Sequence, residues 1–265
     1  MPQSPRAQTP SDGLAWITGA STGIGRAVAE ELARRGWTVA VSARSADKLD
    51  ELAAAWPGRI IVAPCDVTDA AAVAALVAGL EAAHGRIALA FLNAGISIPI
   101  KTPDIDLVAV RRIIDLNVLG AFNCLAALLP AMSARGTGQV AICASIAGYG
   151  GLPNASAYCA SKAAMISTAQ SVAIEMRGRG VLVQVVNPGF VDTPLTRKND
   201  FPMPFLMAPD QAARRCCDGF QRGGFEITFP RRFAFMLKVL NALPYGAYVR
   251  LLAFALSRAP SRMSR

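Results

Sequence analysis

The chain has 265 residues, of which 53% are hydrophobic and 17% are charged. This composition is too apolar for a disordered chain, and the length is sufficient for one large α/β core. Six scattered cysteines without a C-x-x-C spacing disfavour a zinc or dithiol site. They indicate buried thiols in a reducing compartment, so we expect a cytoplasmic protein.

The formal net charge of +9 is concentrated near the C-terminus. Residues 222–265 hold eight Lys or Arg against one acid, Glu226, and therefore carry +7 of the +9. No recognised binding motif accompanies these cations, which disfavours a nucleic-acid partner. Three interpretations stay open for the basic, apolar stretch 231–258: contact with an anionic lipid surface, packing on a partner subunit, or a solvated tail.

Short apolar runs alternate with helical patterns along the first two thirds of the chain. Strands are expected at 14–18, 37–42, 60–63, 87–92, 139–143 and 181–186. Helices are expected at 24–35, 48–55, 69–84, 106–134 and 156–177. Alternating βα units with near-continuous apolar strands are typical of a parallel sheet covered on both faces. We therefore predict an α/β fold with a single Rossmann-type doubly wound sheet of about seven strands.

The alternation stops after the sixth strand. The stretch 190–207 contains three of the prolines and little periodicity, which indicates a loop. A helix at 209–221 and a strand at 225–229 follow. No uncharged run in the basic extension reaches the about 20 residues needed to cross a bilayer. We expect a flexible N-terminal arm at 1–11 and one Rossmann domain at 12–230. This domain should contain a substrate loop at 190–222, and a basic amphipathic extension should follow at 231–265.

A glycine-rich turn follows the first strand and reads Thr18-Gly19-Ala20-Ser21-Thr22-Gly23-Ile24-Gly25. Glycines let the chain turn tightly and let backbone N–H groups approach a pyrophosphate at a helix N-terminus. Alone, such a turn also fits an ordinary strand-to-helix connection. Its position at the first βα junction favours a dinucleotide site.

Two further motifs occur at later strands: Asn93-Ala94-Gly95 after the fourth, and Tyr158-Cys159-Ala160-Ser161-Lys162 after the fifth. With the Gly-x-x-x-Gly-x-Gly turn they resemble the short-chain dehydrogenase/reductase (SDR) family, from about residue 14 to 193. Leu92 stands where many members carry another Asn. The resemblance implies hydride transfer between a nicotinamide cofactor and a carbonyl or secondary alcohol. It also implies a homo-dimer or homo-tetramer.

By this resemblance Tyr158 is the general acid/base, and Lys162 lies four residues further along the same helix face. A phenol with a pKa of about 10 needs a downward shift of about 3 units to transfer protons near neutrality. The ammonium of Lys162 and the charge of an oxidised nicotinamide both act in that direction. Alone, the pair also fits a core aromatic residue beside a snorkelling lysine.

Two other residues complete the catalytic set that the resemblance implies. Ser145 closes the fifth strand and would polarise the substrate oxygen. Asn117, inside the predicted helix 106–134, would join a water-linked proton relay to Lys162. The alternative for Asn117 is a role in helix packing.

The end of the second strand bears on the choice of cofactor. It reads Val41-Ser42-Ala43-Arg44-Ser45, without the acid that NAD-preferring sites use to bind the ribose hydroxyls. Arg44 can instead pair with a 2′-phosphate through charge-assisted hydrogen bonds worth about 1.5–3 kcal/mol. Arg26 is a second candidate cation. We expect NADP(H) rather than NAD(H), unless Arg44 is a solvated surface cation.

The resemblance also assigns cofactor contacts to the glycine turn, to the residues after the third and fourth strands, and to the segment after the sixth. The expected cofactor-binding residues, besides Tyr158 and Lys162, are Gly19, Ser21, Thr22, Gly23, Ile24, Gly25, Arg44, Asp66, Val67, Asn93, Ala94, Gly95, Pro188, Gly189, Val191 and Thr193.

The substrate is expected over the nicotinamide, enclosed by residues 96–100, 148–153 and 190–207. These segments offer mostly apolar side chains, namely Ile96, Ile98, Ile100, Tyr149, Leu152, Phe190, Phe201, Phe205 and Leu206. This favours a hydrophobic ketone or secondary alcohol, although the same residues could simply pack the loop.

Other reaction classes lack their residues. The only histidine, His84, has no Cys or carboxylate cluster around it, so no metal site is expected. A Walker-type phosphate loop is absent from the sequence. The alternative function is a non-catalytic NADP(H)-binding regulatory or interaction protein of the same fold, although the four catalytic-type residues favour an enzyme.

Overall fold

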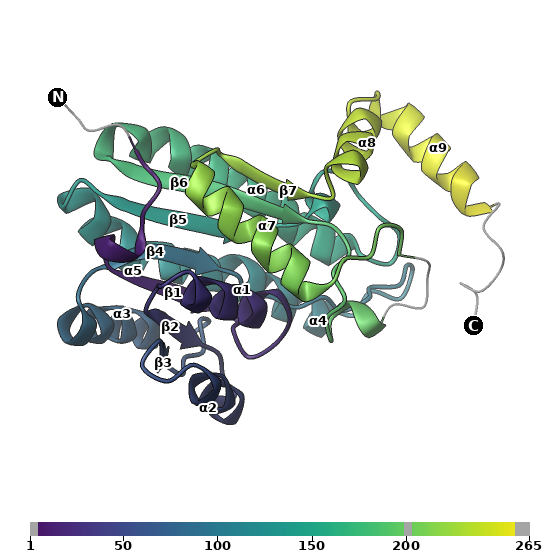
Figure 1. The fold of residues 1–265 in the computed structure, drawn as a ribbon. Helices are drawn as coiled ribbons and strands as arrows, with labels where there is room; N and C mark the ends of the chain where they lie inside the picture. The colour runs from purple at the N-terminus through teal and green to yellow at the C-terminus, as the bar shows by residue number, and fades with distance from the viewer. Residues whose placement is uncertain (1–4, 199–202, 258–265) are drawn as a thin grey trace.

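Seven parallel strands form one sheet in the order β3-β2-β1-β4-β5-β6-β7 in the computed structural model, which describes residues 5–198 and 203–257 (Figure 1). The strands are β1 (Leu14–Thr18), β2 (Val39–Ser42), β3 (Ile60–Val62), β4 (Ile87–Leu92), β5 (Gly138–Cys143), β6 (Val181–Pro188) and β7 (Glu226–Phe229). This arrangement confirms the predicted doubly wound fold. The strands are added outward in one direction from β1 and in the other direction from β4. Folds of this kind bind ligands at the point between these two strands, where the strand order reverses.

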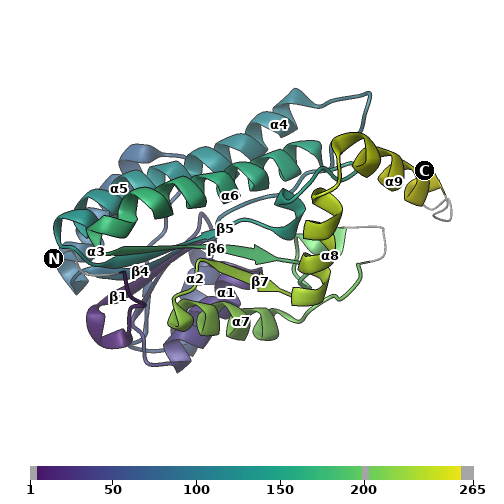
Figure 2. The same ribbon diagram turned by 90° about the horizontal axis from the view of Figure 1, so that it is seen from above.

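Helices cover both faces of the sheet (Figure 2). One layer contains α1 (Gly23–Arg34), α2 (Ala46–Ala55) and α7 (Pro209–Arg222). The other contains α3 (Ala70–His84), α4 (Leu107–Ile114), α5 (Gly120–Ala134) and α6 (Ser156–Met176). Every residue of β1, β4 and β5 is buried between the layers, which explains why these strands are apolar apart from Thr18 and Gln139.

The helix expected over 106–134 contains a π-helical turn at Asp115–Leu119, between α4 and α5. Asn117 lies in this turn, and such turns occur frequently at functional sites. Hydrophobic periodicity does not signal the turn. The joined helix Leu107–Ala134 is long and apolar enough, by length and composition, to cross a membrane. Here it covers the sheet, with α5 against α3 and α4 against α6.

The N-terminal segment 1–11, expected as a flexible arm, is anchored in its described part. The backbone N–H of Gln8 donates to Oε1 of Gln139 at 2.7 Å, and Gln8 is buried. Arg6 forms an ion pair with Asp12 at 2.6 Å. Residue 139 is a buried glutamine in β5 that needs hydrogen-bond partners, and the arm supplies one of them.

The basic extension forms two short helices, α8 (Arg231–Asn241) and α9 (Tyr245–Ser257), separated near Pro244. Helix α8 contacts β7, and α9 projects beyond the end of the sheet (Figure 1). They lie at the carboxyl end of the strands, on the same side as the loop that follows β6 (Figure 2).

Gly180 is required by the turn that enters β6. Its φ is +71°, and an added Cβ would lie 2.0 Å from the carbonyl oxygen of Gly136. We expect Gly180→Ala to lower the free energy of unfolding by about 2–4 kcal/mol, because it adds a left-handed strain and a backbone clash. The corresponding fall in Tm, measured by thermal denaturation, is roughly 5–15 °C.

Gly178 provides the matched control two residues earlier, since nothing lies within 4 Å of the position that a Cβ would take there. Gly178→Ala should change stability by less than about 0.5 kcal/mol. Equal effects of the two substitutions would contradict this account of the turn.

Candidate active site

A cavity of about 360 Å³ opens at the carboxyl ends of β1, β2, β4, β5 and β6. It is lined by every residue expected to bind cofactor except Gly25 and the candidate cation Arg26, and by three of the four expected catalytic residues. Those three are Ser145, Tyr158 and Lys162. The cavity therefore joins the glycine turn after β1 to the Tyr-x-x-x-Lys pair on α6.

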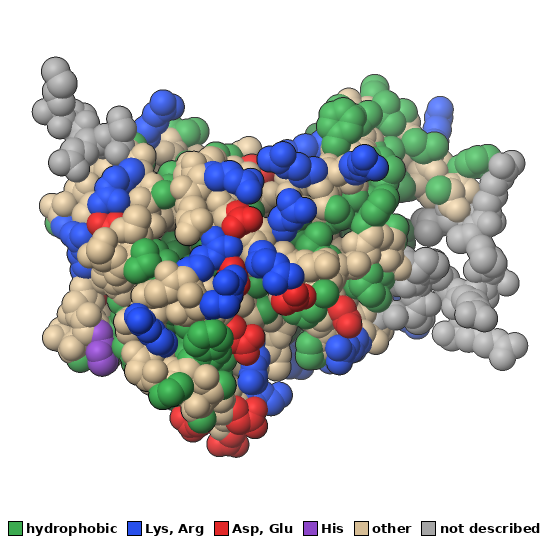
Figure 3. All heavy atoms as spheres, in the orientation of Figure 1, with side chains coloured by type: hydrophobic (Ala, Val, Ile, Leu, Met, Phe, Trp, Pro, Cys, Tyr) green, Lys and Arg blue, Asp and Glu red, His purple; other side chains and the backbone are tan. Residues whose placement is uncertain are grey.

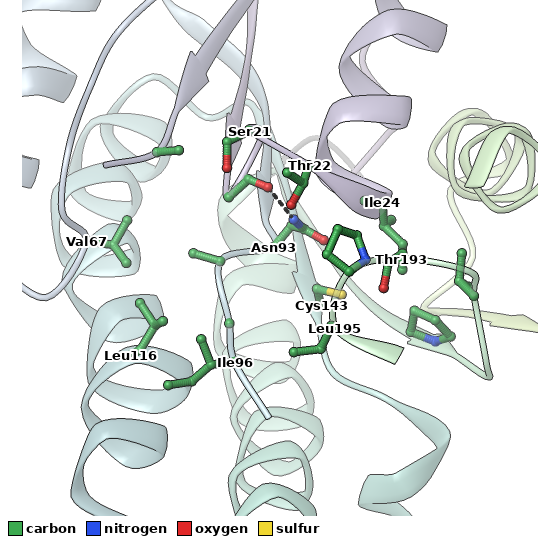
Figure 4. A pocket seen from close by; sticks show the side chains of 18 of the residues that line it. Ser21, Thr22, Ile24, Val67, Asn93, Ile96, Leu116, Cys143, Thr193 and Leu195 are labelled. Carbon is green, nitrogen blue, oxygen red and sulfur yellow. Dashed lines mark hydrogen bonds between the residues drawn. The ribbon is translucent and has the colours of Figure 1, made fainter. Parts of the chain in front are cut away.

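The glycine turn begins α1 and closely approaches the segment after β4. A Cβ on Gly19 would lie 2.8 Å from Cα of Ala94, and one on Gly25 would lie 2.4 Å from the carbonyl oxygen of Gly19. Only glycine fits at these two positions. Gly25 thus supports the turn from behind, whereas Ser21, Thr22 and Ile24 line the cavity (Figure 4).

Thr18, which sequence reasoning did not select, connects the two strand ends. Its Oγ1 accepts from the backbone N–H groups of Asn93 and Ala94 at 3.0 and 3.1 Å. The side-chain amide of Asn93 donates back to the carbonyl oxygens of Thr18 and Gly19, both at 3.2 Å. These bonds close the gap between β1 and β4 and hold Ala94 and its neighbours along the cavity.

The far end of the cavity is lined by Arg44 and Asp66, which lie after β2 and β3. Asp66 accepts from the backbone N–H and the hydroxyl of Thr68 at 3.0 and 2.8 Å. The bonds from Thr68, together with the charge of Arg44, lower the pKa of the Asp66 carboxyl. Arg44 is exposed and free to reach a ligand there.

Arg26, expected as a second cation for the cofactor, does not line the cavity. It pairs instead with Glu30 at 3.3 Å and Glu51 at 3.7 Å. The i+4 spacing on α1 explains the first pair, and the second pair joins α1 to the middle of α2. The prediction for Arg26 is therefore wrong.

Tyr158 and Lys162 lie on the same face of α6, as their spacing requires. Nζ of Lys162 is 5.7 Å from the centroid of the Tyr158 ring and donates to the carbonyl oxygen of Cys143 at 2.9 Å. The Ser145 hydroxyl donates to the carbonyl oxygen of Pro188 at 3.3 Å and lies near enough to the Tyr158 phenol to lower its pKa. The end of β5 thus positions both the ammonium and the phenol.

Burial raises the pKa of the Tyr158 phenol well above its ordinary value, and the nearby Ser145 hydroxyl acts in the opposite direction. Burial also lowers the pKa of the Lys162 ammonium. The lowered phenol pKa expected from the sequence left this burial out of account.

Asn117 lies beside this group rather than on the cavity surface. Its Oδ1 accepts from the N–H of Ile96 at 2.8 Å, and its Nδ2 donates to the carbonyl oxygen of Ile96 and to Oγ of Ser161. A Cβ on Gly95 would lie 3.1 Å from Oδ1 of Asn117 and 3.5 Å from Nζ of Lys162. Asn117 and Lys162 therefore flank the same glycine.

The segment after β6 completes the cavity with Pro188, Gly189, Val191 and Thr193. The Thr193 backbone N–H donates to the Thr196 hydroxyl at 3.0 Å, which curls the segment toward the glycine turn. Figure 4 shows Thr193 near Ile24, across from the wall formed by residues 67, 96 and 116.

Several lining residues were not predicted. Most stand one or two residues from a predicted site residue, namely Ser42, Ala43, Ser45, Cys65, Leu116, Cys143, Ala144, Pro194 and Leu195. Extension of each motif by one or two residues would have found them. Thr196 stands three residues after Thr193.

Some of the side chains expected to enclose the substrate line the cavity, and others make contacts elsewhere. Ile96 lines the cavity. Ile100 is instead buried against α4, and the Tyr149 hydroxyl donates to Glu226 at 2.6 Å. Phe190 packs on Phe233 of α8. Phe201 lies outside the described residues.

Comparisons with known proteins agree with this geometry. Residues 14–202 match the sequence profile of the short chain dehydrogenase family. An uncharacterized oxidoreductase of Myxococcus xanthus (strain DK1622) is 39% identical over 233 residues, 87% of this chain and 92% of that protein. A 2-dehydro-3-deoxy-L-rhamnonate dehydrogenase (NAD(+)) of Sphingomonas sp. (strain SKA58) is 35% identical over 182 residues, 68% of this chain and 72% of that protein.

A solved structure is similar over most of the chain. The crystal structure of a short chain dehydrogenase from Burkholderia cenocepacia J2315 in complex with NADP has a TM-score of 0.79 at 25% identity, covering 91% of this chain and 97% of that chain. Profile, sequence relative and fold all lead to the same family. The chain belongs to the short chain dehydrogenases, oxidoreductases that use a nicotinamide cofactor.

Proposed function

We propose that this protein is an NADP(H)-dependent oxidoreductase that interconverts a carbonyl and a secondary alcohol, with Tyr158 as the general acid/base. The observation that carries the proposal is the shared cavity, which contacts the glycine turn, Arg44 and the pair of Tyr158 and Lys162. A dinucleotide needs such an extended cavity at the carboxyl edge of a parallel sheet. The close backbone approaches at Gly19 and Gly25 support this fit.

The bound nicotinamide supplies or accepts the hydride. In reduction, the Tyr158 hydroxyl donates its proton to the substrate carbonyl oxygen, and in oxidation the phenolate takes the proton back. The Ser145 hydroxyl, which acts to lower the pKa of Tyr158, would donate to the same substrate oxygen and orient it. The Lys162 ammonium would bind the nicotinamide ribose, and Asn117 holds the backbone of Ile96 beside it.

Arg44 supports a preference for NADP(H). It lines the cavity after β2, where no carboxylate stands to repel a 2′-phosphate. One relative carries NAD(+) in its name and one similar structure holds NADP. The cofactor preference of this protein must therefore be inferred from its own residues at this end of the cavity.

The cavity wall supports an apolar substrate. Ile96, Leu116 and Leu195 contribute side chains without polar groups (Figure 4). A hydrophobic ketone or alcohol would bury its body there while its oxygen meets Ser145 and Tyr158. We also propose a homo-oligomer, supported by exposed apolar side chains such as Phe122 on α5, and a cytoplasmic location.

Replacement of Tyr158 by Phe removes the transferable proton and keeps the ring. We expect kcat/KM for a panel of hydrophobic ketones with NADPH to fall by about 10²–10⁴-fold, while NADPH binding, followed by fluorescence, is retained. Tyr245→Phe, at an exposed tyrosine of α9, is the matched control and should leave the rate unchanged. Binding of NADPH without turnover of any carbonyl or alcohol by the wild-type protein would favour the non-catalytic alternative.

Replacement of Arg44 by Gln tests the cofactor preference. The ratio of kcat/KM with NADPH to kcat/KM with NADH should fall about tenfold or more, because a charge-assisted bond to the 2′-phosphate is lost. Arg26→Gln is the control, since Arg26 is held by Glu30 and Glu51 away from the cavity. A ratio that is the same in both variants would rule out Arg44 as the phosphate partner.

Replacement of Ser145 by Ala should change the pH profile of alcohol oxidation. Oxidation needs the Tyr158 phenolate, so kcat/KM rises with pH through the apparent pKa of that group. The Ser145 hydrogen bond lowers this pKa, and its removal should shift the rising limb to higher pH. Ser171→Ala, at an exposed serine of α6, should keep the wild-type profile. A limb that stays in place or moves to lower pH would contradict the role given to Ser145.

A further inference from the structure

Helix α8 is apolar on two opposite sides. Its inner side buries Phe233 and Ala234 against Ile146. Its outer side exposes Phe235 and Val239 to 70% and 53%. Residues four apart share one helix face, so these two form a continuous outer stripe. A solvated helix fills that side with polar residues, whereas α8 places this apolar stripe there beside two arginines.

Helix α9 extends the same apolar surface (Figure 3). Tyr245 and Val249 are 87% and 63% exposed, and Arg250 is the only charged residue of the helix. The Tyr248 hydroxyl donates to the carbonyl oxygen of Gly151 at 2.7 Å and anchors the helix to the body. Together, the outer side of α8 and the exposed side chains of α9 form what we call the α8–α9 surface. Large exposed apolar patches mark contacts with proteins or membranes.

The charges around the α8–α9 surface have one sign. From residue 227 to the C-terminus the sequence holds seven Lys or Arg and no Asp or Glu. Arg231 and Arg232 stand one turn before Phe235 and Met236 on the outer side of α8. Among the described residues, neither of these arginines forms an ion pair, whereas Lys238 is paired with Glu226.

A second copy of the chain fits this surface poorly. A symmetric contact through α8 would bring arginines of the two copies together around an apolar centre, and like charges repel. An anionic lipid surface accepts both features, because apolar side chains enter the acyl boundary and arginines meet the headgroups. The two helices, of 11 and 13 residues, are too short to span the bilayer.

We propose that the α8–α9 surface binds the interface of an anionic lipid bilayer and holds the protein there as a peripheral protein. The surface lies next to the substrate side of the site, since the Phe233 ring is 6.0 Å from that of Phe190 and 5.7 Å from that of Phe205. A substrate dissolved in the bilayer would reach the loop 190–207 directly. The membrane contact itself does not depend on the proposed reaction.

Flotation of the full-length protein with vesicles tests the contact. The probes are vesicles of phosphatidylcholine alone and of phosphatidylcholine with about 30% phosphatidylglycerol, in low and physiological salt. We expect at least tenfold stronger binding to the anionic vesicles, weakened by added salt. Binding that is equal on both vesicle types, or absent from both, would overturn the proposal.

Two variants separate the apolar and charged parts of the α8–α9 surface. Phe235→Glu with Val239→Glu should abolish flotation, while Leu107→Glu with Val108→Glu, at exposed apolar positions of α4, should not. Arg231→Gln with Arg232→Gln should weaken binding to anionic vesicles about tenfold, and Arg111→Gln with Arg112→Gln should leave it unchanged.

Folding and oligomeric state complete the test. Each variant should keep the wild-type circular dichroism spectrum and Tm, because all substituted side chains are exposed. Light scattering of the wild type and of the Phe235→Glu, Val239→Glu variant should give the same mass. A dimer that this variant dissociates would assign the surface to a second copy and overturn the membrane proposal, whatever the outcome of the activity assays.

Discussion

The burial of the Lys162 ammonium constrains how β5 and α6 meet beside the cavity. Lys162 is 5% exposed, and the acceptor that the structure gives its Nζ is the carbonyl oxygen of Cys143. Burial of a cation costs several kcal/mol unless it is paired, so the position of Nζ depends on the end of β5 and the first turns of α6. Tyr158, one turn earlier, is fixed by the same two elements. The residues around Gly95 leave room for both Asn117 and the ammonium.

The burial of the pair bears on the protonation of both side chains. Burial acts on Tyr158 and Lys162 in opposite directions, raising the pKa of the phenol and lowering that of the ammonium. Both shifts favour neutral forms. A ligand that brings positive charge beside the phenol would act against the rise in its pKa.

The sequence predicted the sheet, because β1 and β4 are apolar except for Thr18 and glycines stand near their ends. It also predicted the site residues that belong to spaced motifs, such as Gly19 and Tyr158. It could not predict contacts that depend on the angle between elements. Arg26 meets Glu51 because α1 and α2 cover the same face of the sheet. Asn117 in the π-helical turn bonds to Ile96 and Ser161, which lie far away in the sequence.

The C-terminal helices are joined to the site by one carboxylate. Glu226, at the start of β7, accepts from Tyr149 at 2.6 Å and Asn187 at 2.8 Å and pairs with Lys238 of α8. Burial opposes ionisation of Glu226, but the bonds from these three residues outweigh it and lower the pKa of the carboxyl. The carboxylate thus connects α8 to the segment after β5 and to the end of β6.

That connection gives the extension a role beyond covering the sheet edge. The inner side of α8 contacts Phe190 and Ile146, which follow β6 and β5, so the helix packs on the segments beside Ser145 and Gly189. The outer side of the same helix carries the exposed Phe235 stripe. A single packed helix therefore lies between this stripe and the segments beside the cavity. The dinucleotide end, formed by the glycine turn and Arg44, lies on other elements and is not part of this contact.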